Sequence, residues 1–88
     1  MRMTENEIAT IKSRCEKATK GPWVSYVEGR DHSCGSNFIM TGCENDRGDD
    51  IELIGATVDD QDFIAHARQD IPLLINEIDR LKALIHQL

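Results

Sequence analysis

The sequence predicts a small α+β domain in the order N-terminal helix, three-stranded antiparallel sheet, short helix and long C-terminal helix. Three observations predict this order: apolar residues at helical spacing near the start, short β-forming runs between turn residues in the middle, and a sustained apolar spacing in the last third. A chain of 88 residues suffices for one domain, so we expect a single domain over residues 1–88. Its 40% hydrophobic and 30% charged residues are typical of a folded chain.

The first helix is predicted by a capping box and an apolar face. Thr4 and Glu7 have the spacing at which a hydroxyl and a carboxylate each accept a bond from the other residue's backbone N–H. Apolar residues then recur at steps of three and four: Ile8, Ile11, Cys15 and Ala18. Gly21 offers a left-handed exit and Pro22 cannot continue a helix. We therefore expect a helix over residues 4–19.

The middle of the chain predicts a sheet. Residues 23–28, 38–42 and 51–54 are short runs rich in β-branched and aromatic side chains. Residues 29–36 form a polar connection with two glycines, and residues 43–50 form an acidic turn. The three runs predict an antiparallel meander, and the helices are available to cover one of its faces.

The last third predicts two helices. Asp59 and Asp60 are good N-cap residues for a short helix, and Asp70 with Pro72 can start a second, longer one. In that second helix, apolar residues alternate steps of three and four, which is the heptad spacing of a coiled coil. These positions form the predicted oligomer interface: Ile71, Leu74, Ile78, Leu81, Ile85 and Leu88. Further apolar residues flank it: Leu73, Ile75 and Leu84. So short a chain cannot hide the whole stripe, so we expect copies to pair, in an orientation that the sequence leaves open.

Charge and composition limit the partners. The formal net charge of −6 disfavours binding to nucleic acid and suits a basic protein surface or simple solubility. No apolar run approaches the roughly 20 residues that span a membrane, and the first residues lack a signal-peptide core, so we expect a cytoplasmic protein without membrane contact. Three cysteines, an odd number, predict free thiols.

Metal sites are not predicted. His32, Cys34 and Cys43 are possible zinc ligands, but they lack a C-x-x-C pair and an evident fourth ligand. Residues 44–50 are rich in oxygen atoms, yet Gly48 comes too early for a calcium loop of the EF-hand type. We therefore expect no metal and no cofactor.

Catalysis is disfavoured as well. The chain has no G-x-S-x-G elbow, phosphate loop, G-x-G-x-x-G fingerprint or H-E-x-x-H motif. Cys15 lies on the predicted apolar face, where a structural thiol is expected. Asp62 and His66 are four residues apart, a spacing typical of a surface contact on a helix. We therefore expect a protein that is not an enzyme.

Ligand or partner binding is the remaining class of function. Residues 29–37 are dense in hydrogen-bonding side chains and are bounded by a glycine, as functional loops often are, although an ordinary solvated connection has the same composition. An anionic ligand would need an arginine to overcome the acidic background. Trp23 is either an interface anchor or part of the core. The candidate ligand-binding residues are Trp23, Arg30, His32, Ser36, Asn37 and Arg47.

Two segments carry a resemblance to a known family. Residues 18–23 (ATKGPW) resemble an A-T-x-G-P-W element, and residues 59–81 resemble a closing segment D-x-x-F-I-A-x-A-R-x-D-I-P-x-L-L-x-E-I-x-R-L. Both occur in the Ead-like small early proteins of phages and prophages. The resemblance covers about half of the chain and leaves residues 24–58 without a counterpart. It implies a phage or prophage source and a bacterial host cell, and the family has no common biochemical role to carry over.

The expected function follows from these features together. We expect a non-catalytic phage accessory protein with an anti-defence role, which sequesters a host defence protein or a small, nucleotide-like signalling ligand as a homo-oligomer. One alternative is an immunity-type inhibitor of a basic toxin, which would use the acidic residues Glu44, Asp46, Asp49, Asp50, Asp59 and Asp60. The other is a small metal- or thiol-dependent enzyme that uses His32, Cys34 and Cys43.

Overall fold

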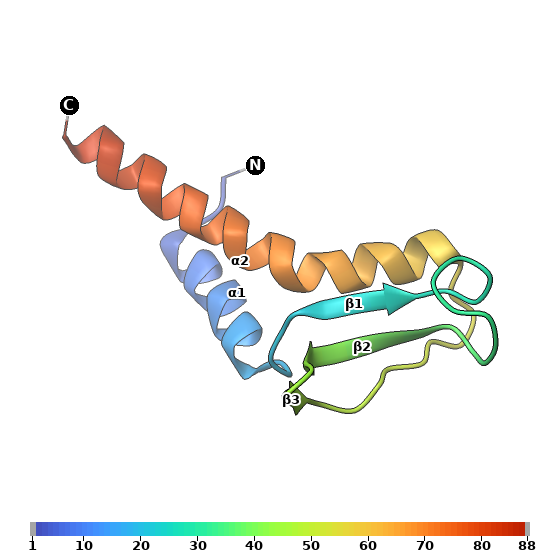
Figure 1. Ribbon diagram of the computed structural model, residues 1–88. Helices are drawn as coiled ribbons and strands as arrows, with labels where there is room; N and C mark the ends of the chain where they lie inside the picture. Colours follow the sequence, from blue (N-terminus) through green and yellow to red (C-terminus); the bar gives the residue numbers. More distant parts are fainter. Residues whose placement is uncertain (1, 88) are drawn as a thin grey trace. The chain divides into compact units, whose positions relative to one another are not determined.

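The computed structural model describes residues 2–87, and these contain two helices and a three-stranded antiparallel sheet (Figure 1). The elements in chain order are α1 (Glu5–Lys17), β1 (Trp23–Tyr26), β2 (Phe38–Cys43), β3 (Asp46–Arg47) and α2 (Val58–His86). The predicted α+β fold, with an N-terminal helix, an antiparallel sheet and a long C-terminal helix, is confirmed. The chain forms two compact units: α1 with the part of α2 from Asp70 onward, and residues 19–69.

The predicted capping box starts α1. Thr4 Oγ1 accepts a bond from the Glu7 backbone nitrogen at 3.1 Å, and a Glu7 carboxylate oxygen accepts one from the Thr4 backbone nitrogen at 2.8 Å. The bond from the Thr4 backbone nitrogen, followed by the Thr4 hydroxyl, lowers the pKa of the Glu7 carboxyl. The predicted end is wrong, because α1 stops at Lys17 and Ala18 leaves in an extended conformation. Gly21 is not among the glycines with positive φ, so the chain needs no left-handed exit there.

The sheet has the order β1-β2-β3, and its third strand differs from the prediction. β3 lies within the segment predicted as a turn and pairs with β2 through Gly42 opposite Arg47. The predicted strand over residues 51–54 is wrong, because only Ile51 bridges to β2, opposite Ile39. The physical reason is a tight reversal after β2. Gly42 has a φ of +79°, and a Cβ there would lie 2.2 Å from the Asp46 carbonyl oxygen, so glycine lets β3 fold back at once.

The C-terminal third is one helix, so the predicted division into a short and a long helix is wrong. Asp70 does not cap a second helix, and Pro72 lies inside α2. An interior proline costs about 3 kcal/mol, because it removes one backbone bond and crowds the preceding turn. Packing holds the helix on both sides of it, since Ala65 is 1% exposed and Ile75 is 5% exposed.

The start of α2 also differs from the prediction. Asp59 and Asp60 are not its N-cap, because the helix begins at Val58. Thr57 and Asp60 exchange two bonds of 3.0 Å, each side chain accepting from the other's backbone nitrogen. This is a second capping box, and the T-x-x-D spacing was its sequence signal.

The core of residues 19–69 centres on β2. Ile39 and Thr41 are fully buried, and Val27 and Ala65 are buried as well. The first turns of α2 run alongside β1 (Figure 1). No helix within residues 2–87 is long and apolar enough to cross a membrane.

Candidate functional site

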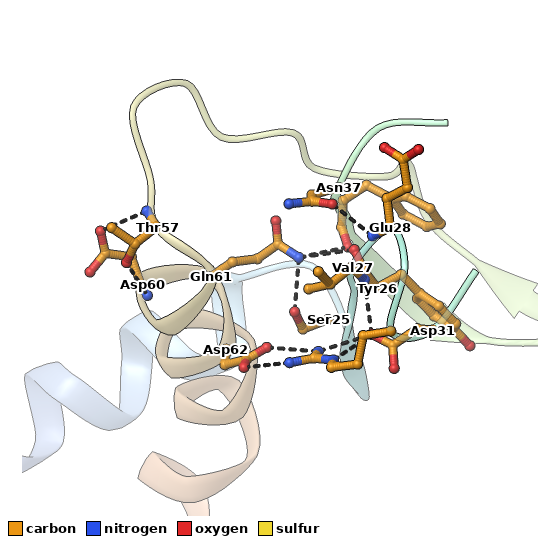
Figure 2. Close-up of polar contacts among 12 residues, drawn as sticks. Ser25, Tyr26, Val27, Glu28, Asp31, Asn37, Thr57, Asp60, Gln61 and Asp62 are labelled. Carbon is orange, nitrogen blue, oxygen red and sulfur yellow. Dashed lines mark hydrogen bonds and ion pairs between the residues drawn. The ribbon is translucent and has the colours of Figure 1, made fainter. Parts of the chain in front are cut away.

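One face of α2 is attached to the sheet by polar side chains. Gln61, Ala65 and Gln69 recur every four residues and therefore share a helix face. Gln61 is only 3% exposed. Its amide nitrogen donates to Ser25 Oγ at 2.8 Å and to the Tyr26 carbonyl oxygen at 3.1 Å (Figure 2). A third, longer bond of 3.3 Å reaches the Phe38 carbonyl oxygen. The buried amide of Gln61 thus attaches α2 to both β1 and β2.

Gln69 makes a second attachment, at the free edge of β1. Its Oε1 accepts from the Trp23 backbone nitrogen at 2.8 Å, and its Nε2 donates to the Trp23 carbonyl oxygen at 3.0 Å. A side-chain amide thus pairs with the edge strand as a neighbouring strand would. Trp23 is half-buried, and its Nε1 donates to the Thr19 carbonyl oxygen at 3.0 Å.

Arg30 connects the loop of residues 29–37 to α2. Its two terminal nitrogens donate to the two oxygens of Asp62 at 2.8 and 3.0 Å, and its Nε donates to Asp31 at 2.9 Å (Figure 2). Asp31 also accepts a 2.8 Å bond from the Val27 backbone nitrogen. We call Arg30, Asp31 and Asp62 the arginine clamp.

The clamp leaves an excess of negative charge. The bonds from Arg30, followed by a bond from Ser25, lower the pKa of Asp62 to about 2. Arg30 likewise lowers the pKa of Asp31, and the two carboxylates raise the pKa of Arg30. All three groups are therefore charged at neutral pH. One positive and two negative charges give the clamp a net charge of −1.

An open pocket of about 370 Å³ lies beside the clamp, between β1 and the first half of α2. Asp62, His66 and Gln69 enter it from one helix face, at steps of four and three residues. Trp23, Ser25 and the clamp complete most of its lining. An aromatic ring beside carboxylates is a setting that binds cations, through the ring face and through charge-assisted hydrogen bonds. We call this the clamp pocket.

The other predicted ligand-binding residues lie outside the clamp pocket, and each is bonded to another residue of the chain. His32 Nδ1 is 2.7 Å from the Cys34 carbonyl oxygen, and its ring lies 5.7 Å from the Phe38 ring. Ser36 Oγ donates to Glu52 at 2.8 Å. Two further contacts complete the set: the Asn37 side-chain oxygen accepts from the Glu28 backbone nitrogen, and Arg47 pairs with Asp50. Of the six predicted residues, the structure brings only Trp23 and Arg30 together in this pocket.

The cysteines are free thiols, as predicted. Cys15 is half-buried, and Cys34 and Cys43 are exposed. Within residues 2–87, no three His, Cys, Asp or Glu side chains are grouped to hold a metal ion, so His32, Cys34 and Cys43 do not form such a group.

The predicted oligomer interface is partly exposed. Leu74 is 62% and Ile85 66% exposed, and Ile71 and Leu81 are exposed to a smaller extent. Ile78 is half-buried, and Leu88 lies outside the described residues. The exposed apolar surface also includes Leu73 and Leu84.

The polar residues that build the pocket were only partly visible in the sequence. Asp62 and His66 have the spacing of a surface contact on a helix, which does not reveal that Arg30 and Trp23 face them. Gln69, which lines the pocket, and Gln61, which is buried outside its lining, were both missed. Their signal was the four-residue spacing around Ala65, which marks a buried face, but two glutamines on such a face do not resemble a core.

We compared the chain with protein-family models, with curated proteins and with solved structures, and none of them matches. The likeness to Ead-like proteins therefore stays a prediction from the two sequence segments.

Proposed function

We propose that the protein is a non-catalytic accessory protein of a phage or prophage, with an anti-defence role, and that it works by occupying a host protein. The observation that carries this proposal is the charge of the clamp pocket. Its two carboxylates exceed its one guanidinium, and Trp23 lines the same pocket. A lysine or arginine side chain from the host protein would meet negative charge and an aromatic face there.

The acidic character of the whole chain supports the same kind of partner. A net charge of −6 attracts a basic surface over several ångströms and speeds encounter with it. The partner we propose is therefore a basic host protein that inserts one cationic side chain into the clamp pocket.

A small nucleotide-like ligand receives less support from the geometry. Arg30 binds two carboxylates, and Arg47 binds Asp50. A phosphate group would have to displace these carboxylates from either arginine before it could bind. Ligand sequestration is therefore the less favoured form of the proposal.

The resemblance to Ead-like proteins supports the phage source and action inside the host cell. The exposed apolar residues of α2 support self-association, because isolated large apolar side chains are common on surfaces but a row of them is not. We include homo-oligomer formation through the C-terminal part of α2 in the proposal.

A second candidate is an immunity-type inhibitor of a basic toxin. It is favoured by the exposure of the acidic residues outside the clamp pocket: Glu44, Asp46, Asp49, Asp50, Asp59 and Asp60. Such an inhibitor would use acidic charge spread over this surface rather than one pocket.

Two matched variants separate these candidates. Asp62→Asn and Asp59→Asn each remove one negative charge from the first turns of α2, but only Asp62 lines the clamp pocket. The chain is expressed in a bacterial host that restricts a defence-sensitive phage, and plaque formation is counted. Wild type and Asp59→Asn should raise plaque formation, and Asp62→Asn should not.

Binding of short peptides by calorimetry tests the chemistry directly. An arginine-containing peptide should bind, more weakly as salt rises, and Asp62→Asn should weaken it several-fold more than Asp59→Asn. Equal loss in both variants would favour the dispersed acidic surface of a toxin inhibitor. Retention of a nucleotide that is lost in Arg30→Ala would favour ligand sequestration.

A further inference from the structure

The C-terminal part of α2 has one face that is covered and one that is open. Ile75 is 5% exposed, whereas Leu73 and Leu84 are 64% and 49% exposed. Leu73, Glu77, Arg80 and Leu84 follow one another at steps of four, three and four residues, so they lie in one row along the helix. This row, which we call the outer row, lies on the side of the helix opposite Ile75.

The outer row is self-complementary when it is reversed. Its order is apolar, acidic, basic, apolar. In an antiparallel pair, Leu73 of one copy meets Leu84 of the other, and Glu77 meets Arg80. In a parallel pair in register, Glu77 would face Glu77 and Arg80 would face Arg80, and both contacts are repulsive.

The charges of the outer row are available for such a contact. The Glu77 side chain is 50% exposed and the Arg80 side chain 63% exposed, and Arg80 Nε lies 2.7 Å from a Glu77 oxygen. An exposed pair three residues apart on one helix contributes little to stability. Glu77 and Arg80 can therefore share their hydrogen bonds with a second copy at little cost.

We propose that two copies of this chain pair antiparallel through the outer row, with a two-fold axis that crosses α2 between Glu77 and Arg80. The proposal rests on the self-association proposed above and adds its orientation and its size, a dimer. Such an interface is isologous: Glu77 of one copy contacts Arg80 of the other, and Arg80 of the first copy contacts Glu77 of the second.

The area is sufficient for a specific dimer. Leu74 and Leu81, 62% and 43% exposed, lie next to the outer row and extend its apolar surface. Two copies that bury these four leucines together with Glu77 and Arg80 would remove on the order of 1,000 Å² from water, which is about the lower bound for a specific interface. We therefore expect a dimer of moderate affinity that dissociates on dilution.

Charge reversal tests the orientation, and sedimentation measures dimer dissociation. Glu77→Arg places two arginines opposite each other in an antiparallel pair and should raise the dissociation constant about tenfold or more. Adding Arg80→Glu restores opposite charges and should restore the dimer. Asp79→Arg makes the same charge change on an exposed position away from the outer row and should have little effect.

Cross-linking gives a second, independent readout. In a background with all three native cysteines replaced by serine, chains with Leu73→Cys are mixed with chains with Leu84→Cys and oxidised. The antiparallel pair predicts a product that joins the two different chains. A product that joins Leu73→Cys chains only to each other shows a parallel pair and overturns the proposal.

Failure of the proposed dimer can be distinguished from failure of the proposed cation binding in the clamp pocket. A wild-type chain that stays monomeric at about 100 μM overturns self-association and its orientation together. A dimer that Glu77→Arg leaves intact overturns the orientation alone. Binding of the arginine peptide, measured in the same samples, reports the clamp pocket separately.

Discussion

The amide of Gln61 is a buried polar contact within residues 19–69 whose removal should be costly. Its Nε2 lies within hydrogen-bond distance of three acceptors, Ser25 Oγ and the carbonyl oxygens of Tyr26 and Phe38, so one of its two N–H groups is shared between two of them. Gln61→Met keeps the length of the side chain and removes all three bonds. Each lost bond to a buried partner costs about 1 kcal/mol, so we expect the free energy of unfolding to fall by roughly 2–3 kcal/mol.

That loss is large for this chain. A domain of this size is stable by about 5–10 kcal/mol. A loss of 2–3 kcal/mol should lower the Tm by roughly 10–20 °C, measured by circular dichroism. Gln87→Met, at an exposed position just after the end of α2, is the matched control and should change stability by less than about 0.5 kcal/mol. Equal Tm values for the two variants would refute the claim that Gln61 fastens α2 to the sheet.

Three further predictions follow from the same structure. Gly42→Ala adds a Cβ 2.2 Å from a backbone oxygen at a φ of +79°, so it should lower the free energy of unfolding in urea by more than about 2 kcal/mol. Gly29→Ala, at a φ of +83° but with open space around the added Cβ, should lower it by only about 1 kcal/mol. The folded pKa of Asp62, about 2, lies below its ordinary value of 3.8, so the contribution of its charge to stability is present above about pH 4 and is lost as the pH falls toward 2. Asp62→Asn should flatten the measured dependence of stability on pH over that range. An unchanged slope would count against the arginine clamp. Ile75→Ala should cost about 2–4 kcal/mol, while Leu84→Ala in the monomer should cost less than about 1 kcal/mol, and similar costs would contradict the assignment of covered and open faces.

The sequence predicted the elements whose signals are local. Thr4 and Glu7 marked the start of α1 because a capping box involves residues of one turn. The runs around Trp23 and Phe38 predicted β1 and β2 from their side-chain types. Where two local signals competed, the prediction failed. Asp70 with Pro72 has the pattern of a helix start, yet packing on both sides carries the helix through.

The clamp pocket could be predicted only in part, because its residues come from distant segments. Trp23 and Arg30 stood out by their types. Arg30 and Asp62 lie 32 residues apart in the chain, and nothing local shows that a carboxylate will bind the guanidinium. That contact reverses the expected chemistry, since an arginine expected to attract anions becomes part of a negative site. β3 was missed for a related reason, since Asp46 and Arg47 have the composition of a turn and form a strand only through pairing with β2.

The most direct test of the clamp pocket uses the only tryptophan of the chain as a reporter. An NMR spectrum of the labelled protein shows one tryptophan indole N–H signal, that of Trp23, which lines the pocket. We predict that an arginine-containing peptide shifts this signal in a saturable way at low salt, and that a glutamate-containing peptide of the same length does not. An unmoved indole signal, or one that both peptides shift alike, would contradict cation binding in the clamp pocket.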